Sequence, residues 1–158
     1  MAADRRALAQ MFADVTLGSP DNAIGFVLWR LVHRFQRKID RALAEANLTH
    51  LQFTTLALVA WLSREEGVAQ QVDISRQGDI HPMQVSLMLK TLAAKGLVIR
   101  TPSEARPPGK CVEITPEGIA ALRRAMPLAI EVQRDMFGEP GRPGGSLLKA
   151  LLQSLGRS

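Results

Sequence analysis

The chain has 158 residues, of which 46% are hydrophobic and 22% charged. Its 20 Lys and Arg exceed its 15 Asp and Glu, which gives a formal net charge of +5 at pH 7 and points to polyanionic partners. This length suits one domain with a real core, and the lack of any run of about 18 uncharged apolar residues excludes a membrane-spanning helix. Three His and a single Cys exclude an intrachain disulfide framework and argue against a metal site. Residues Met1 to Arg6 lack the basic-then-apolar order of a signal peptide, so we expect a cytoplasmic protein. We also expect it to hold no metal or cofactor.

Two helices are predicted in the first 46 residues. The first, Asp4 to Leu17, has apolar residues at helical spacing (Leu8, Met11, Phe12, Val15) and stops at Gly18-Ser19-Pro20. Asp21 or Asn22 caps a longer second helix to about Ala46. This helix has one apolar stripe (Ile24, Val27, Leu28, Leu31, Phe35, Ile39, Ala42), and cations cover much of the remainder (Arg30, Arg34, Arg37, Lys38, Arg41).

A pair of helices follows a long central one. Thr49 and Gln52 form a capping box for a helix that is apolar on nearly every side and ends at Gly67. Residues 68–78 form a weak, short helix, and residues 79–82 form a turn. Pro82 then starts a helix that runs to Lys95 and ends at Gly96.

A hairpin and two more helices complete the chain. Leu97–Arg100 and Lys110–Thr115 read as two strands around a proline-containing loop. Thr115, Pro116 and Glu117 open a helix that Pro127 is expected to kink, and Ser146 caps a last helix after a Gly- and Pro-rich linker. Helix–turn–helix followed by a hairpin predicts a winged helix-turn-helix, mainly α with a small two-stranded β wing.

The second helix of the pair carries the candidate reading face. Val85, Met88, Leu89 and Leu92 fall on the side expected to be buried, while Met83, Leu87, Lys90 and Ala94 point outward with Gln84 and Ser86 on the flanks. The outward side has no acid, and Lys90 and Lys95 are its cations, as a helix in the major groove requires. Gln84 can address adenine, Ser86 a base or a phosphate, and Met83 and Leu87 a thymine methyl. Alternatively, Met83 and Leu87 pack against another part of the protein.

The hairpin adds a second candidate contact. Arg100, Arg106 and Lys110 lie in or beside its loop, against the single acid Glu104. A basic tip of this kind can reach a neighbouring minor groove, and Arg106 is the best single candidate. The alternative is an ordinary solvated loop.

These residues resemble the MarR family of bacterial transcription regulators. The likeness rests on Leu48-Thr49-x-x-Gln52, on Val85-Ser86, on Leu92-x-x-Lys95-Gly96-Leu97-Val98-x-Arg100 and on Ile114-Thr115-x-x-Gly118. It implies a homodimer whose N- and C-terminal helices interlock, bound to a palindromic operator on double-stranded DNA, with repression relieved by a ligand. The chain then divides into N-terminal dimerisation helices (1–47), a winged helix-turn-helix domain (48–115) and C-terminal dimerisation helices (116–158).

The first helix of the pair departs from the family pattern. Ile74-Ser75 replaces the usual Leu-Ala, Gly78 replaces a leucine, and Asp79 replaces the glycine that follows. Because glycine disfavours helix, we expect this helix to be shortened or frayed. His81 stands where a serine is frequent, at a position that the resemblance assigns to the DNA contact.

The effector and redox positions are less defined. Trp29, His33, Phe53 and Trp61 could line a cleft for a small aromatic effector, although Phe53 and Trp61 can equally belong to an ordinary buried core. The resemblance gives Cys111 no sensing role, because it lies on the second wing strand, and we interpret it as a small packed or edge residue.

Two functions follow from these patterns. The leading one is a dimeric, sequence-specific DNA-binding regulator, a ligand-responsive repressor. The alternative is a winged-helix module that binds a protein through Met83 and Leu87 and has no DNA role. The sequence argues against an enzyme, because it has no Gly-rich phosphate loop, metal pair or plausible nucleophile constellation.

Overall fold

The computed structural model describes residues 4–15, 18–103 and 109–156. Its helices are α1 (Arg5–Asp14), η1 (Pro20–Asn22), α2 (Ile24–Leu43), η2 (Ala44–Ala46), α3 (His50–Ser63), α4 (Gln71–Gly78), α5 (Pro82–Ala94), α6 (Pro116–Phe137), η3 (Glu139–Gly141) and α7 (Ser146–Ser154). Its strands are β1 (Ala69–Gln70), β2 (Val98–Ser103) and β3 (Gly109–Ile114). Among the described residues, none of these helices has the length and apolar character needed to cross a membrane. The chain forms two compact units, residues 1–37 and residues 38–158.

The first unit leaves its apolar residues in contact with solvent. In α1 the Asp4 side chain caps the helix by accepting from the Arg6 N–H at 2.9 Å, as local sequence rules require. The apolar stripe of α1 is exposed, and so is the early part of the α2 stripe, where Ile24 is 78% exposed. Of the predicted α2 stripe only Ile39 is fully buried; Leu43, outside that stripe, is buried as well, and both residues belong to the second unit.

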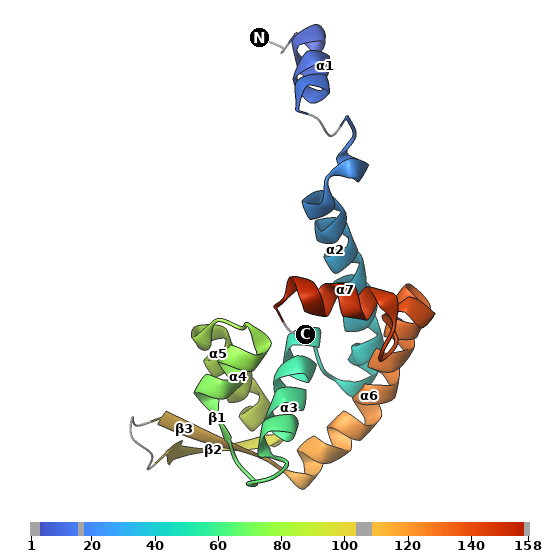
Figure 1. Cartoon of the computed structure of the whole chain (residues 1–158). Helices are drawn as coiled ribbons and strands as arrows, with labels where there is room; N and C mark the ends of the chain where they lie inside the picture. The colour runs from blue at the N-terminus through green and yellow to red at the C-terminus, as the bar shows by residue number, and fades with distance from the viewer. Residues whose placement is uncertain (1–3, 16–17, 104–108, 157–158) are drawn as a thin grey trace. The chain divides into compact units, whose positions relative to one another are not determined.

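The second unit is built around α3, which packs against α4, α5, α6 and β3. Figure 1 shows α3 between the α4–α5 pair and α6. The predicted capping box is present: Thr49 Oγ1 accepts from the Gln52 N–H, and Gln52 Oε1 accepts from the Thr49 N–H, both at 3.2 Å. Beside it, the His50 N–H donates to Asp40 Oδ1 at 2.6 Å. Burial lowers the pKa of the His50 imidazole, and the Asp40 carboxylate partly opposes that shift.

The turn between α4 and α5 shows how this chain accommodates its unusual residues. α4 runs through Gly78, so this glycine does not end the helix early, although the helix begins at Gln71 and is shorter than the predicted residues 68–78. A Cβ at Gly78 would lie 2.8 Å from Leu58 Cδ1 and 2.9 Å from Ile80 Cδ1, so neighbouring side chains occupy the missing space. Asp79 ends the helix in the left-handed region (φ 49°), which Asp tolerates better than most residues. The Ser75 hydroxyl then donates to the Ile80 carbonyl at 2.6 Å, which fixes the path into α5.

The small sheet has three strands where the sequence predicted two. Its order is β1-β3-β2, and both pairs are antiparallel, with Ala69 opposite Val112 and Arg100 opposite Val112 from the other side. The prediction missed β1 because two residues carry no periodicity and their pairing partner lies over 40 positions away in the chain. Otherwise the mainly helical winged fold is as predicted.

The start of α6 is fixed to the end of α5. The Thr115 hydroxyl caps α6 by accepting from the Gly118 N–H at 3.0 Å, and it donates to the Gly96 carbonyl at 2.7 Å. A Cβ at Gly118 would lie 2.1 Å from the Leu97 carbonyl oxygen, so only glycine fits there. Further along, α6 continues as one helix past Pro127, and the kink expected there stays a prediction. The residue that precedes α7 is Gly145, and Ser146, the predicted cap, is the first residue of the helix.

We expect Gly118→Ala to lower the free energy of unfolding by about 3 kcal/mol, because the new methyl group collides with backbone that cannot rotate away. The matched control is Gly25→Ala in α2, where a Cβ meets nothing within 4 Å. This control is expected to leave stability unchanged or to raise it by up to about 1 kcal/mol. Urea unfolding followed by circular dichroism measures both, and equal effects of the two substitutions would contradict the packing argument.

Candidate nucleic-acid interface

The rotation of α5 about its axis is set by its buried side. Val85, Leu89 and Leu92 are completely buried, and Met88 is half-buried. This agrees with the predicted inward side. Residues on the opposite side must then face away from the core, because a helix turns 100° per residue.

The opposite side of α5 is exposed. Met83 is 75% exposed and Leu87 58%, and Gln84 and Lys90 are exposed as well. The alternative interpretation was that Met83 and Leu87 pack against another part of the protein. Their exposure among the described residues contradicts it. The thirteen residues of α5 include no acid, so this side presents one cation, two apolar side chains and an amide.

His81 stands at the N-terminus of α5. It is the N-cap residue, and its Nδ1 accepts from the Met83 N–H at 3.3 Å. The imidazole therefore replaces the usual hydroxyl or carboxylate cap, and it is exposed at the helix end where anions are favoured.

Lys95, expected on the outward side, makes internal contacts. Its Nζ donates to the Asn47 carbonyl at 2.7 Å and to Gln52 Oε1 at 3.1 Å. The same Gln52 oxygen belongs to the capping box of α3. Lys95 thus ties the end of α5 to the start of α3, and Lys90 is the cation that stays on the outward side.

Arg100 and Ser86, both predicted DNA contacts, meet each other. Arg100 Nη2 donates from β2 to Gln71 Oε1 at 3.2 Å and to Ser86 Oγ at 3.5 Å. Arg100 Nε is buried and, among the described residues, has no hydrogen-bond partner. Arg100 therefore links the wing to α4 and α5, and Ser86 is half-buried on that side of α5.

The rest of the wing is partly described. Lys110 is exposed on β3, where it pairs with Pro102, and together with Arg100 and Thr101 these residues line a hollow of about 350 Å³. Arg106 and Glu104 lie outside the described residues. The wing thus brings Lys110 and Arg100 to the same part of the hairpin.

The predicted aromatic cleft residues lie on two helices. In the first unit the ring centroids of Trp29 and His33 are 4.2 Å apart, and His33 Nδ1 is 2.7 Å from the Trp29 carbonyl oxygen. In the second unit Phe53 is half-buried on α3. Trp61 is 56% exposed beneath the Arg64 guanidinium, so it does not belong to a buried core. The shared cleft stays a prediction.

Cys111 is half-buried on the central strand of the sheet, where Gln70 Nε2 lies 3.2 Å from its sulfur. It is a packed residue of that strand and does not lie on an edge strand.

Three polar residues shape this surface through contacts that the sequence analysis did not predict. Gln71, Ser75 and Gln52 hold Arg100, the α4–α5 turn and Lys95 respectively. Only Gln52 carried a local signal, the capping box. No sequence motif indicated the contacts of Gln71 and Ser75, which only the folded structure shows.

Comparison with known proteins finds transcription regulators that are similar to this chain. No family model matches the chain. A curated relative, the uncharacterized HTH-type transcriptional regulator YdcH of Bacillus subtilis (strain 168), is 27% identical over 118 residues, which is 75% of this chain and 80% of YdcH.

Solved structures agree on the fold. CouR from Rhodococcus jostii RHA1, bound to p-coumaroyl-CoA, matches 87% of this chain and 92% of its own with a TM-score of 0.73 at 21% identity. MosR of M. tuberculosis matches 87% and 96% with a TM-score of 0.68 at 26% identity. A mutant MarR from E. coli, complexed with operator DNA, matches 91% and 96% with a TM-score of 0.70 at 18% identity. The solved structures agree with the resemblance to the MarR family at the level of the fold, which is the MarR winged-helix fold.

We expect Lys95→Met to lower the free energy of unfolding by about 1 kcal/mol, because it removes two charge-assisted hydrogen bonds near the surface. Lys90→Met, also on α5 but exposed, is expected to change stability by less than about 0.5 kcal/mol. Urea unfolding of both variants checks this contrast. A Lys95→Met variant as stable as the wild type would show that the joint between α5 and α3 does not depend on the ammonium group.

Proposed function

We propose that this chain, which has the winged-helix fold of the MarR-family transcriptional regulators, is a dimeric, sequence-specific DNA-binding repressor. The observation that carries the proposal is the exposed, acid-free side of α5 beside a cationic wing. A carboxylate there would repel the phosphate backbone, and a net charge of +5 favours a polyanion. The relatives are regulators, a role that needs no catalysis.

In this proposal α5 enters the major groove. Gln84 offers an amide that forms two hydrogen bonds to the N6 and N7 edge of adenine. Met83 and Leu87 contact thymine methyl groups, which accounts for two large apolar side chains left in solvent. Lys90 neutralises a phosphate, and His81 lies at the helix end that approaches the backbone.

The wing reaches the adjacent minor groove. Lys110 and Arg106 supply the cations, since a narrow minor groove concentrates negative potential. Arg100 and Ser86 hold the hairpin against α5 through their contact, so in our proposal they reach DNA only at the edge of the surface.

Dimerisation is supported by the apolar residues that one chain leaves exposed. They lie on the terminal helices: Leu8, Met11, Phe12 and Val15 on α1, Ile119, Met126 and Ile130 on α6, and Leu151, Leu152 and Leu155 on α7. Large apolar side chains exposed in such number are typical of surfaces that pack against a partner. A symmetric dimer then presents two α5 helices to a palindromic operator with half-sites about 10 base pairs apart.

We further propose that a small-molecule ligand relieves repression. CouR was solved with p-coumaroyl-CoA bound, which supports a small-molecule effector for this chain as well. Because the proposed partner is the bacterial chromosome, we place the protein in the cytoplasm.

The second candidate is a protein-binding module that uses the exposed Met83 and Leu87. A mobility-shift assay on the DNA upstream of the protein's own gene, at low and at high salt, separates the two functions. A shift at low salt that weakens at high salt supports the regulator, whereas no shift at low salt supports the protein-binding module.

We expect Gln84→Ala to relax base preference at one position per half-site, with a loss of about 1–3 kcal/mol of discrimination. Selection of bound sequences from random DNA measures this preference and the half-site spacing together. Lys90→Met is the matched control. It is expected to weaken all sequences alike and to reduce the slope of log K against log[salt] by about 0.9 per lost phosphate contact. An unchanged preference in Gln84→Ala would show that the reading face is assigned wrongly.

We expect deletion of residues 1–17 to shift the protein from dimer toward monomer in sedimentation velocity, because it removes the exposed α1 stripe. Phe12→Ser should weaken the dimer in the same direction, whereas Gln10→Ser, on the polar side of α1, should not. A dimer that is unchanged in both the deletion and Phe12→Ser would remove α1 from the interface.

A further inference from the structure

Two large apolar side chains on the exposed side of α5, Met83 and Leu87, are a feature of this surface that charge does not explain. Burial of Val85, Leu89 and Leu92 fixes the rotation of the helix about its axis. Met83 and Leu87 are four residues apart, so they lie within about 40° of one another on the opposite side, one turn apart. Both are exposed. We call them the apolar pair of α5.

The apolar pair has few polar neighbours that are free to read a base. Of the exposed residues of α5, only Gln84 and Lys90 are polar. Ser86 Oγ accepts from Arg100 Nη2 at 3.5 Å, and the Thr91 hydroxyl donates at 3.0 Å to the carbonyl one turn earlier in the helix. The helix has no arginine, the side chain that most often reads guanine. If Lys90 neutralises a phosphate, one amide and the apolar pair are left to distinguish base pairs.

The major groove offers such apolar side chains one kind of partner. Every base pair presents hydrogen-bonding groups there, and the apolar group at a base edge is the C5-methyl of thymine. Uracil has the hydrogen-bonding groups of thymine without this methyl. Conversely, 5-methylcytosine has the hydrogen-bonding groups of cytosine and carries a methyl at the same ring position as thymine. The methyl group can therefore be added or removed without a change in the hydrogen bonds.

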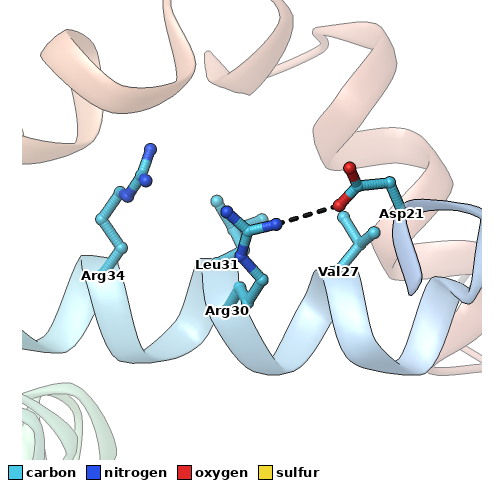
Figure 2. Close-up of a pocket in the computed structure, with 5 residues that line it drawn as sticks. All are labelled: Asp21, Val27, Arg30, Leu31 and Arg34. Carbon is cyan, nitrogen blue, oxygen red and sulfur yellow. Dashed lines mark hydrogen bonds and ion pairs between the residues drawn. The ribbon is translucent and has the colours of Figure 1, made fainter. Parts of the chain in front are cut away.

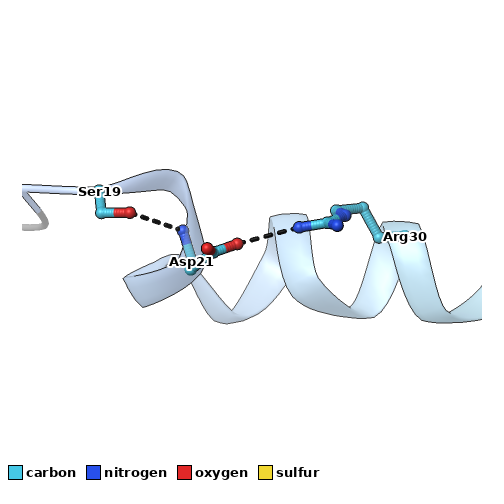
Figure 3. Close-up of polar contacts among 3 residues, drawn as sticks. All are labelled: Ser19, Asp21 and Arg30. Atoms are coloured by element: carbon cyan, nitrogen blue, oxygen red, sulfur yellow. Dashed lines mark hydrogen bonds and ion pairs between the residues drawn. The ribbon is translucent and has the colours of Figure 1, made fainter.

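A comparable combination of apolar side chains and a cation in the first unit includes an acid. Figure 2 shows Val27, Arg30 and Leu31 on α2. Arg30 Nη1 donates to Asp21 Oδ1 at 2.9 Å, and Ser19 Oγ accepts from the Asp21 N–H at 3.3 Å (Figure 3). The Asp21 carboxylate balances the cation and would repel a phosphate backbone. Because α5 contains no acid, its apolar pair is compatible with DNA in a way that this surface is not.

We propose that the apolar pair of α5 reads the C5-methyl group of pyrimidines, whichever base carries it. The inference rests on the proposed function, because it requires α5 in the major groove. At a contacted position, 5-methylcytosine is then preferred over cytosine by the same factor by which thymine is preferred over uracil. The affinity of this chain for DNA therefore depends on cytosine methylation within the bound sequence.

Fluorescence anisotropy of the full-length protein with short duplexes, at one fixed salt concentration, tests this proposal. The starting duplex is a sequence selected from random DNA. Each pyrimidine of one half-site is varied in turn among thymine, uracil, cytosine and 5-methylcytosine, with the matching base opposite. At a contacted position, removal of the thymine methyl should weaken binding about fourfold, the effect of exposing one buried methyl group. Methylation of cytosine there should strengthen binding by the same factor of about four.

Met83→Ala and Leu87→Ala identify the side chains that make the contact. Each should reduce the methyl preference at its own position to less than about 1.5-fold, because the shorter side chain no longer covers the methyl group. Val72→Ala is the matched control, since Val72 is an exposed apolar residue of α4 outside the apolar pair. It should keep the full preference of about fourfold.

A uracil duplex bound as tightly as the thymine duplex at every position would overturn the proposal and leave the regulator standing. A methyl preference that persists in both Met83→Ala and Leu87→Ala would also overturn it, because the preference would then come from the deformability of the DNA. A chain that selects no DNA sequence would overturn the regulator and this proposal together, and would favour a protein partner for the apolar pair.

Discussion

Complete burial of Val85, Leu89 and Leu92 fixes α5 in one rotation about its axis. Turning the helix by even one residue position would bring Gln84 or Lys90 toward the core, and an unpaired polar group there is costly. The same constraint that stabilises the second unit therefore decides which side chains meet solvent. The interface follows from packing, because a helix that buries one side must present the other.

Polar joints then set the direction of this helix. Its start depends on the Ser75–Ile80 hydrogen bond and the left-handed Asp79, and its end on the Lys95 ammonium and the Thr115 hydroxyl. The Lys95 and Thr115 contacts join the end of α5 to α3 and to α6, which lie far from it in the sequence. The wing is attached to α4 and α5 through Arg100. A reading helix and a wing held together in this way can match two adjacent grooves.

Cations in this chain have two different roles, which their residue type does not reveal. Lys95 and Arg100 donate to the protein itself, whereas Lys90 and Lys110 face solvent. In the first unit Arg30 is paired with Asp21, whereas Arg34 forms no ion pair with any acid that the structure describes. Net charge therefore indicates a class of partner, while the individual contacts indicate which cations remain for it.

The sequence by itself determined where α3, α5 and α6 begin and which side of α5 faces inward. Caps such as Thr49 with Gln52, and starts such as Pro82 and Pro116, act over two or three residues, and apolar periodicity is a local property. Only the tertiary structure decided the pairing of Ala69 with Val112, the inward turn of Lys95 and the exposure of Trp61. Each of these depends on which distant residue lies nearby, and neither spacing nor composition carries that information.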